Sequence, residues 1–277
     1  MRILRYQYET GYAPRTFIGG RLEDKNFSDN TVWLNFTAAS IIKELGRLDI
    51  LDIEVPYNNG AVGTVYEHLW RSVDFLYHFS GLYDLVKIWG GDWNDCMNTA
   101  GLGGRGVSVW LSIAGVHENG GVYLHTIAWK IAADAMLGRA DRVEEDIRTI
   151  LPFRNPIVDG RAEPYVMCNS YFGEQTGYRY GTPGQSWRTA AGQWFQKALV
   201  NYVFGLQPEM DGLHVRPCLP PSWKNCAITK RFRDTLYHIT YQNNGTSVKE
   251  ILVNGNPLTE AALPLTGGTV EVVVVTE

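Results

Sequence analysis

Two aspartates, Asp92 and Asp95, flank Trp93 in a run that opens with Gly90 and Gly91. A carboxylic acid beside an exposed aromatic ring suits a sugar-cleaving site, because the ring covers the apolar face of a pyranose and the acid protonates the leaving oxygen. A dry, aromatic-lined pocket would raise the pKa of such an acid. A turn or a helix N-cap also uses aspartates at this spacing. The run therefore indicates a candidate general acid without selecting between the two.

Two further segments combine glycines with polar side chains where a helix is expected to begin. The first, Glu118–His125, places Tyr123 and His125 at the start of a predicted helix, beside two glycines that let backbone approach a ligand closely. The second, Gly181–Gly192, is a small-residue turn that runs into another predicted helix. Backbone amides in a first helical turn bind anions such as phosphate, although no Lys follows these glycines as in a P-loop. The segments indicate an anion site, and a histidine that only packs or caps is the alternative.

The composition is that of a globular protein with many aromatic side chains. The chain has 277 residues, of which 45% are hydrophobic and 19% charged, and its formal net charge is -4. This charge argues against nucleic acid as the main partner. The 9 Trp, 15 Tyr and 10 Phe residues suit a carbohydrate or another neutral ligand.

Four cysteines, Cys96, Cys168, Cys218 and Cys226, lack any CxxC spacing. They predict reduced thiols rather than a disulfide framework or a metal site. The N-terminal residues lack the apolar core of a signal peptide, and no run is as long as a membrane-spanning helix. We therefore expect a cytoplasmic protein that does not associate with a membrane.

The elements that must position these residues change in character along the chain. Helical periodicity, often closed by a glycine, predicts five helices: 31–45, 64–79, 122–137, 139–151 and 186–204. After Gly205, prolines are followed by period-two runs at 236–241, 251–253 and 270–275, with Asn-Gly turn signals between them. The chain is therefore predicted to be mainly α, with a helical domain over 1–205 and a small antiparallel β-domain over 206–277.

Several longer motifs follow one another in a fixed order. They are Gly-Asp-Trp-Asn-Asp-x-Met-Asn at 91–98, Gly-Arg-Gly-x-Ser-Val-Trp-Leu at 104–111, Glu-Asn-Gly-Gly-x-Tyr-x-His at 118–125, Glu-Pro-Tyr-Val at 163–166, Ser-Trp-x-Thr at 186–189 and Gly-Leu-x-x-x-Pro-Cys-Leu-Pro-x-x-Trp at 212–223. In these motifs the chain resembles glycoside hydrolase family 94, formerly glycosyltransferase family 36. This family comprises the cellobiose and chitobiose phosphorylases and the related cyclic glucan synthase domain.

The resemblance implies a fold and a reaction. The fold would be an (α/α)6 barrel followed by a C-terminal β-sandwich. The reaction would be inverting phosphorolysis, a hexosyl transfer in which a β-glycoside and inorganic phosphate give an α-sugar 1-phosphate. The implied partners are a small carbohydrate and phosphate, without nucleic acid, metal or cofactor. A single catalytic acid suffices because phosphate is its own nucleophile, whereas an inverting hydrolase needs a second carboxylate to activate water.

The resemblance also implies roles for individual residues. Asp95 matches the general acid. His125, Thr189 and Ala190 match phosphate-binding positions, Ala190 standing where the family usually has Gly. Charge-assisted donors at these positions would hold a phosphate dianion. The residues expected to contact sugar are Asp29, Asp92, Trp93, Glu118, Tyr123 and Glu163.

The chain departs from the family pattern in three places. It begins inside the family's catalytic domain, and Leu111–His117 joins two motifs that the family separates by a long helical segment. About half the helices of a full barrel are expected, so the barrel is predicted to be incomplete. Exposed helix faces would then favour a homodimer or a partner that supplies the missing segment. The family's Arg-containing phosphate motif is altered at Lys25–Asn30, which leaves Arg15 and Arg21 as candidates for the phosphate-binding arginine.

Three functions remain open from the sequence. The chain is a β-glycoside phosphorylase, a non-catalytic or sugar-binding remnant of one, or an inverting glycosidase that uses Glu118 or Glu163 as its second carboxylate. Convergence of Asp95, His125 and Thr189 on one cleft would favour a working site.

Overall fold

The fold is taken from a computed structural model. It describes residues 2–14, 17–18, 21–22, 27–79, 87, 89, 121–154, 159–163, 166–184, 186–187 and 189–277. The chain forms two compact units, Met1–Ile113 and Ala114–Glu277, here called unit 1 and unit 2.

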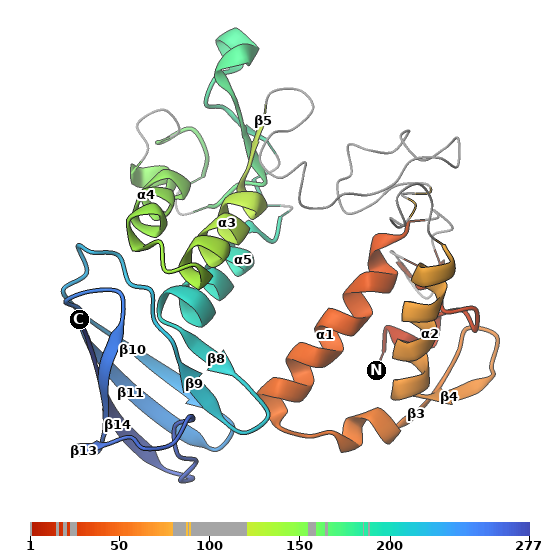
Figure 1. The fold of residues 1–277 in the computed structure, drawn as a ribbon. Helices are drawn as coiled ribbons and strands as arrows, with labels where there is room; N and C mark the ends of the chain where they lie inside the picture. The colour runs from red at the N-terminus through yellow and green to blue at the C-terminus, as the bar shows by residue number, and fades with distance from the viewer. Residues whose placement is uncertain are drawn as a thin grey trace. The chain divides into compact units, whose positions relative to one another are not determined.

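Unit 1 is built around two helices, α1 (Asp29–Leu45) and α2 (Val65–His78), which pack against each other (Figure 1). Both confirm the helices predicted from apolar periodicity. Gly46 ends α1 in the left-handed conformation, with φ +66°, which glycine adopts without steric strain. Other elements in the described part of unit 1 are the short helices η1 (Leu4–Tyr6) and η2 (Asp49–Asp52) and the hairpins β1 (Phe17–Ile18)–β2 (Arg21–Leu22) and β3 (Glu54–Pro56)–β4 (Val62–Thr64).

The described part of unit 1 has a buried apolar cluster with a polar pair beside it. The buried members of the cluster are Leu4, Ala13, Leu34, Val55 and Val65. His68 of α2 is fully buried, and its ring nitrogens lie 2.6 Å from the Gln7 Oε1 atom and 3.0 Å from the Val55 carbonyl oxygen. These hydrogen bonds attach α2 to β3 and to the N-terminal segment. They add to the stabilisation that the apolar side chains give to this packing.

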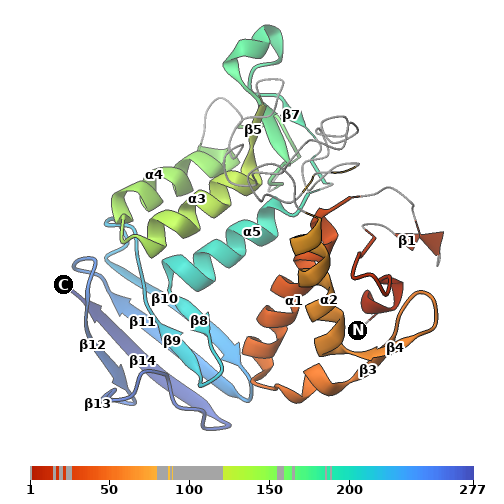
Figure 2. The same ribbon diagram turned by 45° about the vertical axis from the view of Figure 1, so that its right-hand side comes forward.

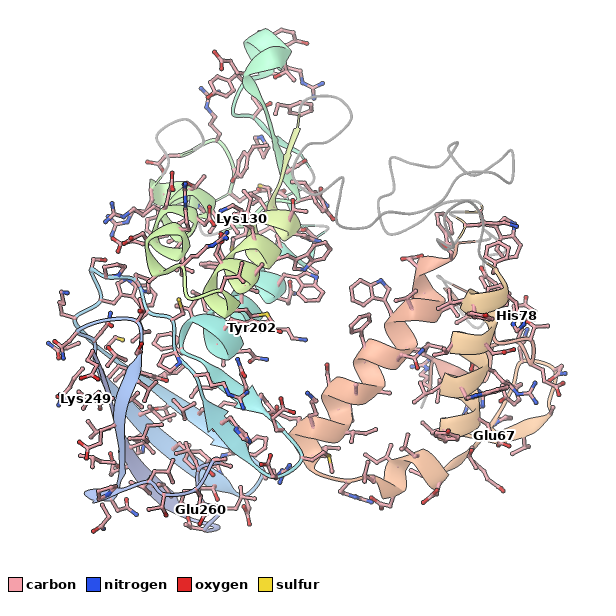
Figure 3. All side chains as sticks on the ribbon, viewed as in Figure 1. Glu67, His78, Lys130, Tyr202, Lys249 and Glu260 are labelled. Atoms are coloured by element: carbon pink, nitrogen blue, oxygen red, sulfur yellow. The ribbon has the colours of Figure 1, made fainter. Side chains whose placement is uncertain are left out.

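Helix α2 begins with a capping box that Thr64 and Glu67 form (Glu67 is labelled in Figure 3). The Glu67 amide donates to the Thr64 hydroxyl at 3.1 Å, and the Thr64 amide donates to the Glu67 carboxylate at 2.6 Å. These bonds satisfy two backbone donors that a helix start otherwise leaves unpaired. Because the first of these bonds needs the Thr64 hydroxyl, removing that hydroxyl measures how much the cap stabilises the start of α2.

Replacing Thr64 with alanine is expected to destabilise the start of α2 by about 1 kcal/mol. Hydrogen–deuterium exchange of the first α2 amides should then accelerate about fivefold. Thr64→Ser keeps the hydroxyl and should exchange like the unaltered protein. Equal exchange in the alanine and serine variants would contradict the capping role.

The described part of unit 2 contains the α-helices α3 (Leu124–Met136), α4 (Ala140–Ile150) and α5 (Ala191–Ala198). Helix α3 packs against both of the others (Figure 2). The Lys130 ammonium joins α3 to α4, since it lies 3.0 Å from the Asp134 carboxylate and 2.6 Å from the Asp146 carboxylate (Figure 3). Short strands β5 (Gly121–Tyr123), β6 (Ser170–Phe172) and β7 (Pro183–Gly184) form an antiparallel sheet at the start of α3. Helices η5 (Pro152–Arg154) and η6 (Glu174–Arg179) lie in the connections.

The helix predicted over 186–204 starts later than expected. Helix α5 begins at Ala191 and continues as a π-helix, η7 (Leu199–Val203). The residues before it are used elsewhere: the Ser186 hydroxyl donates to Glu163, and the Thr189 hydroxyl accepts the Ala191 amide. Local hydrogen bonds of this kind compete with helix formation. Apolar periodicity alone does not predict them, so the predicted helix began too early.

The C-terminal region forms a five-stranded sheet and a separate hairpin, β8 (Leu206–Pro208)–β9 (Leu213–Val215). The sheet has the order β10-β11-β14-β12-β13, with strands β10 (Asn225–Phe232), β11 (Thr235–Gln242), β12 (Val248–Val253), β13 (Asn256–Pro257) and β14 (Thr269–Thr276). Strands β11 and β14 run parallel, so the predicted antiparallel arrangement is wrong and the sheet is mixed.

The sheet is mixed because β14 inserts between β11 and β12, which would otherwise be antiparallel neighbours. The turn after β11 is bonded to the end of β14, since the amides of Asn244 and Gly245 both donate to the Thr276 hydroxyl. A Cβ atom at Gly245 would lie 2.2 Å from the Glu277 backbone, so only glycine fits there. A turn signal in the sequence predicts a reversal of the chain but not which strand lies beside it.

The helices and the sheet of unit 2 share one hydrophobic core. It includes Ile131 of α3, Val143 of α4, Phe195 of α5 and Tyr237 and Val272 of the sheet. The chain changes from helix to strand near residue 205, and the division into two domains there stays a prediction. Within the described parts of both units, no helix is long and apolar enough to cross a lipid bilayer.

Candidate functional site

The structure describes some of the predicted site residues and not others. His125, Thr189, Ala190, Tyr123 and Glu163 lie in unit 2. Those outside the described residues are Asp92, Trp93, Asp95 and Glu118, together with the side chain of Arg21, whose backbone forms part of β2.

Asp29, a predicted sugar contact, belongs to unit 1. It is buried in the first turn of α1, where the positive end of the helix dipole favours a carboxylate. Its role in sugar binding stays a prediction.

The sheet β5-β6-β7 brings the beginnings of two helices together. Strand β5 passes directly into α3, and the Leu124 amide donates to the Asn169 carbonyl at 2.9 Å. The chain after β7 leads to Thr189 and the start of α5. Helices α3 and α5 lie side by side (Figures 1 and 2), and Trp129 packs edge-on against Trp194 between them, with ring centroids 5.5 Å apart.

His125 and Thr189 are in direct contact, although 64 residues separate them in the sequence. The His125 Nε2 atom lies 2.8 Å from the Thr189 Oγ1 atom. On the other side of the ring, the Nδ1 atom lies 3.0 Å from the Tyr123 hydroxyl. The Ala191 amide donates to the Thr189 hydroxyl oxygen at 3.1 Å. Tyr123, His125, Thr189 and the α5 backbone therefore form one hydrogen-bonded chain.

The protonation of His125 follows from its burial. The side chain is 5% exposed, and burial lowers its pKa to about 4, so the imidazole is neutral near pH 7 and carries one N–H. When Nε2 carries the hydrogen, it donates to Thr189 and Tyr123 donates to Nδ1. Thr189 then accepts two hydrogen bonds and can donate its own hydroxyl hydrogen to a further acceptor. In the opposite tautomer Thr189 instead donates to the ring, so its hydroxyl hydrogen is not available to a ligand.

Two helices begin beside the contact between His125 and Thr189. His125 lies in the first turn of α3 and Thr189 just precedes α5, and neither first turn contains an acidic residue. The partial positive charge at both helix starts attracts a negatively charged ligand.

Ala190 is the N-cap residue of α5, with φ -100°. Any L-residue can adopt this backbone conformation. The position therefore does not require the glycine that the family usually has there.

Glu163 lies against the segment between β7 and α5. Its Oε1 atom accepts hydrogen bonds from the Ser186 hydroxyl and from the Trp187 indole N–H, each at 3.1 Å. Bonds from its own backbone amide, from Ser186 and from Trp187 lower the pKa of Glu163, so its carboxylate stays ionised. Sequence reasoning assigned no role to Trp187, although it lies in the Ser-Trp-x-Thr motif.

The acidic, histidine and cysteine side chains offer no metal site within the part of the chain that the structure describes. No three of them gather closely enough to hold an ion. Cys168, Cys218 and Cys226 are free thiols, and Cys96 lies outside the described residues.

The pH dependence of stability is expected to report on His125. Because its pKa falls from 6.5 in the unfolded chain to about 4 in the folded chain, only the unfolded state gains this proton as the pH drops between these values. The folded state is therefore destabilised as the pH falls through this window, by on the order of 1–3 kcal/mol.

Urea unfolding of the unaltered protein and of His125→Asn at several pH values between 4.5 and 7.5 measures this effect. The unaltered protein should lose stability faster than the variant as the pH falls. Parallel pH curves for the two proteins would contradict the buried, neutral imidazole.

Comparison with known families gives a match over most of the chain. The family model described as the glycosyl hydrolase 94 superfamily, catalytic domain, matches residues 15–114 and 112–205. The two matched stretches meet at residues 112–114, inside the predicted junction 111–117 and at the boundary between the two units.

Curated relatives match at lower identity. The solabiose phosphorylase of Paenibacillus borealis is 24% identical over 95% of this chain and 51% of its own length. The N,N'-diacetylchitobiose phosphorylase of Vibrio furnissii is 24% identical over 82% of this chain and 44% of its own length. The 3-O-beta-D-glucopyranosyl-beta-D-glucuronide phosphorylase of Paenibacillus borealis is 29% identical over 57% of this chain and 21% of its own length.

The chain spans about half the length, or less, of these relatives. The alignment with the solabiose phosphorylase extends over 394 residues, whereas this chain has 277. The relative therefore carries well over a hundred residues that this chain lacks within the aligned region.

Proposed function

The chain belongs to the glycosyl hydrolase 94 superfamily, and from this we propose that it catalyses inverting phosphorolysis of a β-glycoside. The substrate is a cellobiose-like di- or oligosaccharide, and inorganic phosphate is the co-substrate. The products are an α-sugar 1-phosphate and a shortened acceptor. These relatives, which are phosphorylases, support phosphorolysis of disaccharides at the level of the family.

The observation that carries the proposal is the contact between His125 and Thr189. It supports a phosphate site because the Thr189 hydroxyl, which His125 holds in place, lies beside two helix starts. Phosphate would accept the Thr189 hydroxyl hydrogen while His125 holds the Thr189 oxygen in place. The backbone of Ala190 adds to this site, and Arg21 is our candidate for a cationic contact.

The chemical step then needs one acid. We assign it to Asp95, which protonates the glycosidic oxygen as a phosphate oxygen attacks the anomeric carbon from the opposite face. The bond from the anomeric carbon to the leaving oxygen breaks, and a bond to phosphate forms with inversion. Trp93, Asp92 and Glu118 would contact the sugar ring. Asp29, Tyr123 and Glu163 complete the set proposed to line the sugar site.

We also propose that the helices belong to an (α/α)6 barrel that lacks part of its ring. The family assignment supports the barrel, and the break in the family match at residues 112–114 supports an internal gap. A barrel with missing helices exposes apolar faces, so this proposal includes self-association or binding of a partner that covers them.

A second candidate function is a non-catalytic remnant that still binds sugar. The residues that this chain lacks within the region aligned with the solabiose phosphorylase favour it. An incomplete barrel would exclude water poorly and would orient phosphate less well.

The test is the disappearance of cellobiose and N,N'-diacetylchitobiose with the intact chain, with and without inorganic phosphate. Turnover only in the presence of phosphate is the expected result. Turnover that does not depend on phosphate indicates a glycosidase. Absence of turnover in both conditions, with sugar binding retained, indicates the remnant.

A further inference from the structure

Trp187 is unusually exposed for its size. Its relative exposure is 72%, and tryptophan is highly buried on average in folded proteins. An exposed indole leaves a large apolar surface in water, and a ligand stacked on the ring would remove part of that surface from water. Trp187 lies in a motif that sequence reasoning connected to the family but to which it gave no chemical role.

The ring is nevertheless fixed in orientation. Its indole N–H donates to the Glu163 Oε1 atom at 3.1 Å, and the neighbouring Ser186 hydroxyl donates to the same oxygen at 3.1 Å. Glu163 thus anchors two consecutive residues of the segment. A ring held in this way loses less conformational entropy when a ligand binds.

The hydrogen bond also restricts how a ligand can use the ring. With its one donor already engaged, the indole offers only its faces. The faces of an aromatic ring stack on the apolar C–H face of a pyranose. The Trp187 ring can therefore stack on a neutral carbohydrate, but its indole nitrogen is not available to hydrogen-bond to one.

Trp187 is also close to the proposed phosphate site. It stands two residues before Thr189, so the two Cα atoms are at most about 7 Å apart. A sugar stacked on Trp187 would therefore lie near a phosphate bound at Thr189, as phosphorolysis requires.

We propose that Trp187 is the stacking platform of a carbohydrate subsite and that Glu163 is the positioning residue that holds the indole in place. The proposal rests on the proposed function for the identity of the neighbouring phosphate site. It gives Glu163 a role through Trp187 in addition to any direct contact with sugar.

Calorimetric titration of cellobiose, N,N'-diacetylchitobiose and inorganic phosphate into the intact chain tests the proposal. Trp187→Ala should weaken binding of the preferred disaccharide about 3–10-fold, while phosphate affinity changes less than twofold. Trp187→Phe keeps an aromatic face and should restore most of the lost affinity. Trp70→Ala is the matched control, because Trp70 lies on α2 and is 56% exposed.

The positioning role of Glu163 has its own readout. In Glu163→Ala the indole loses its anchor, and the fluorescence anisotropy of the tryptophans should fall. That decrease should be absent when Trp187 is already replaced by Phe. Glu163→Gln keeps an acceptor oxygen and should behave more like the unaltered protein in both sugar affinity and anisotropy.

The outcomes separate this inference from the proposed function. Unchanged disaccharide affinity in Trp187→Ala, or no disaccharide binding by the unaltered chain, overturns the platform. Loss of sugar affinity in that variant without any phosphorolysis supports the platform and removes the proposed function. Normal phosphorolysis by the unaltered chain, with unchanged disaccharide affinity in Trp187→Ala, supports the proposed function and overturns the platform.

Discussion

Replacing Asp95 with asparagine is expected to lower the rate of sugar 1-phosphate formation about 10²–10⁴-fold, the usual contribution of a general acid. Asparagine has nearly the same shape but carries no acidic proton for the glycosidic oxygen. Binding of sugar and phosphate should change little, because Asp95 contributes its proton only as the bond breaks. The measurement compares kcat for the variant and the unaltered chain at saturating phosphate.

Two controls sharpen this prediction. Asp92→Asn changes the other acid of the same run and should reduce kcat far less. An aryl β-glycoside whose leaving group is a weak base needs little protonation, so Asp95→Asn should lose less activity on it than on cellobiose. Full turnover of cellobiose by Asp95→Asn would show that the acid is assigned to the wrong residue, and loss in Asp92→Asn instead would identify the right one.

Replacing Thr189 with valine is expected to raise the KM for phosphate about 10–100-fold, the value of one or two hydrogen bonds to a charged group. Valine has the shape of threonine without its hydroxyl. It removes the donor to phosphate and leaves the Ala191 amide and the His125 Nε2 atom without the oxygen they now contact. Initial rates over a range of phosphate concentrations at saturating disaccharide give the KM and kcat separately.

Thr189→Ser keeps the hydroxyl and should restore the KM to within a few-fold of the unaltered value. Thr182→Val is a matched control on the same segment, because its hydroxyl is exposed and donates to the Arg179 carbonyl. An unchanged KM for phosphate in Thr189→Val would place the phosphate elsewhere.

Much of the fold follows from local sequence patterns. Apolar periodicity and a closing glycine predicted α1, and the Thr-x-x-Glu start and apolar periodicity agree with α2. These signals act within a few residues, so they can be read without knowledge of the rest of the chain. The parallel pairing of β11 with β14 could not be predicted in this way, because it depends on a strand that returns from more than twenty residues further along.

In the candidate site too, local features could be predicted from the sequence, whereas contacts between distant residues could not. The placement of His125 in the first turn of a helix was predicted from its local context, and the structure confirms it. Its contact with Thr189 depends on how α3 and α5 pack, which a single sequence does not state. The anchoring of Trp187 by Glu163 was missed for the same reason, since the two residues lie 24 apart in the chain.

The family motifs supplied what local patterns could not. They led to the assignment that the family match confirms, and they identified the junction at 111–117 where that match breaks. Asp95 lies outside the described residues, so its proposed role as the acid comes from the family motif.

The identity of the phosphorus-containing product is the most direct test of the central claim. Phosphorus NMR can follow the intact chain with a β-linked disaccharide and inorganic phosphate. We expect the phosphate signal to decline as the signal of an α-sugar 1-phosphate grows in equal amount. Release of free sugar with the phosphate signal unchanged, or formation of a β-sugar 1-phosphate, would contradict it.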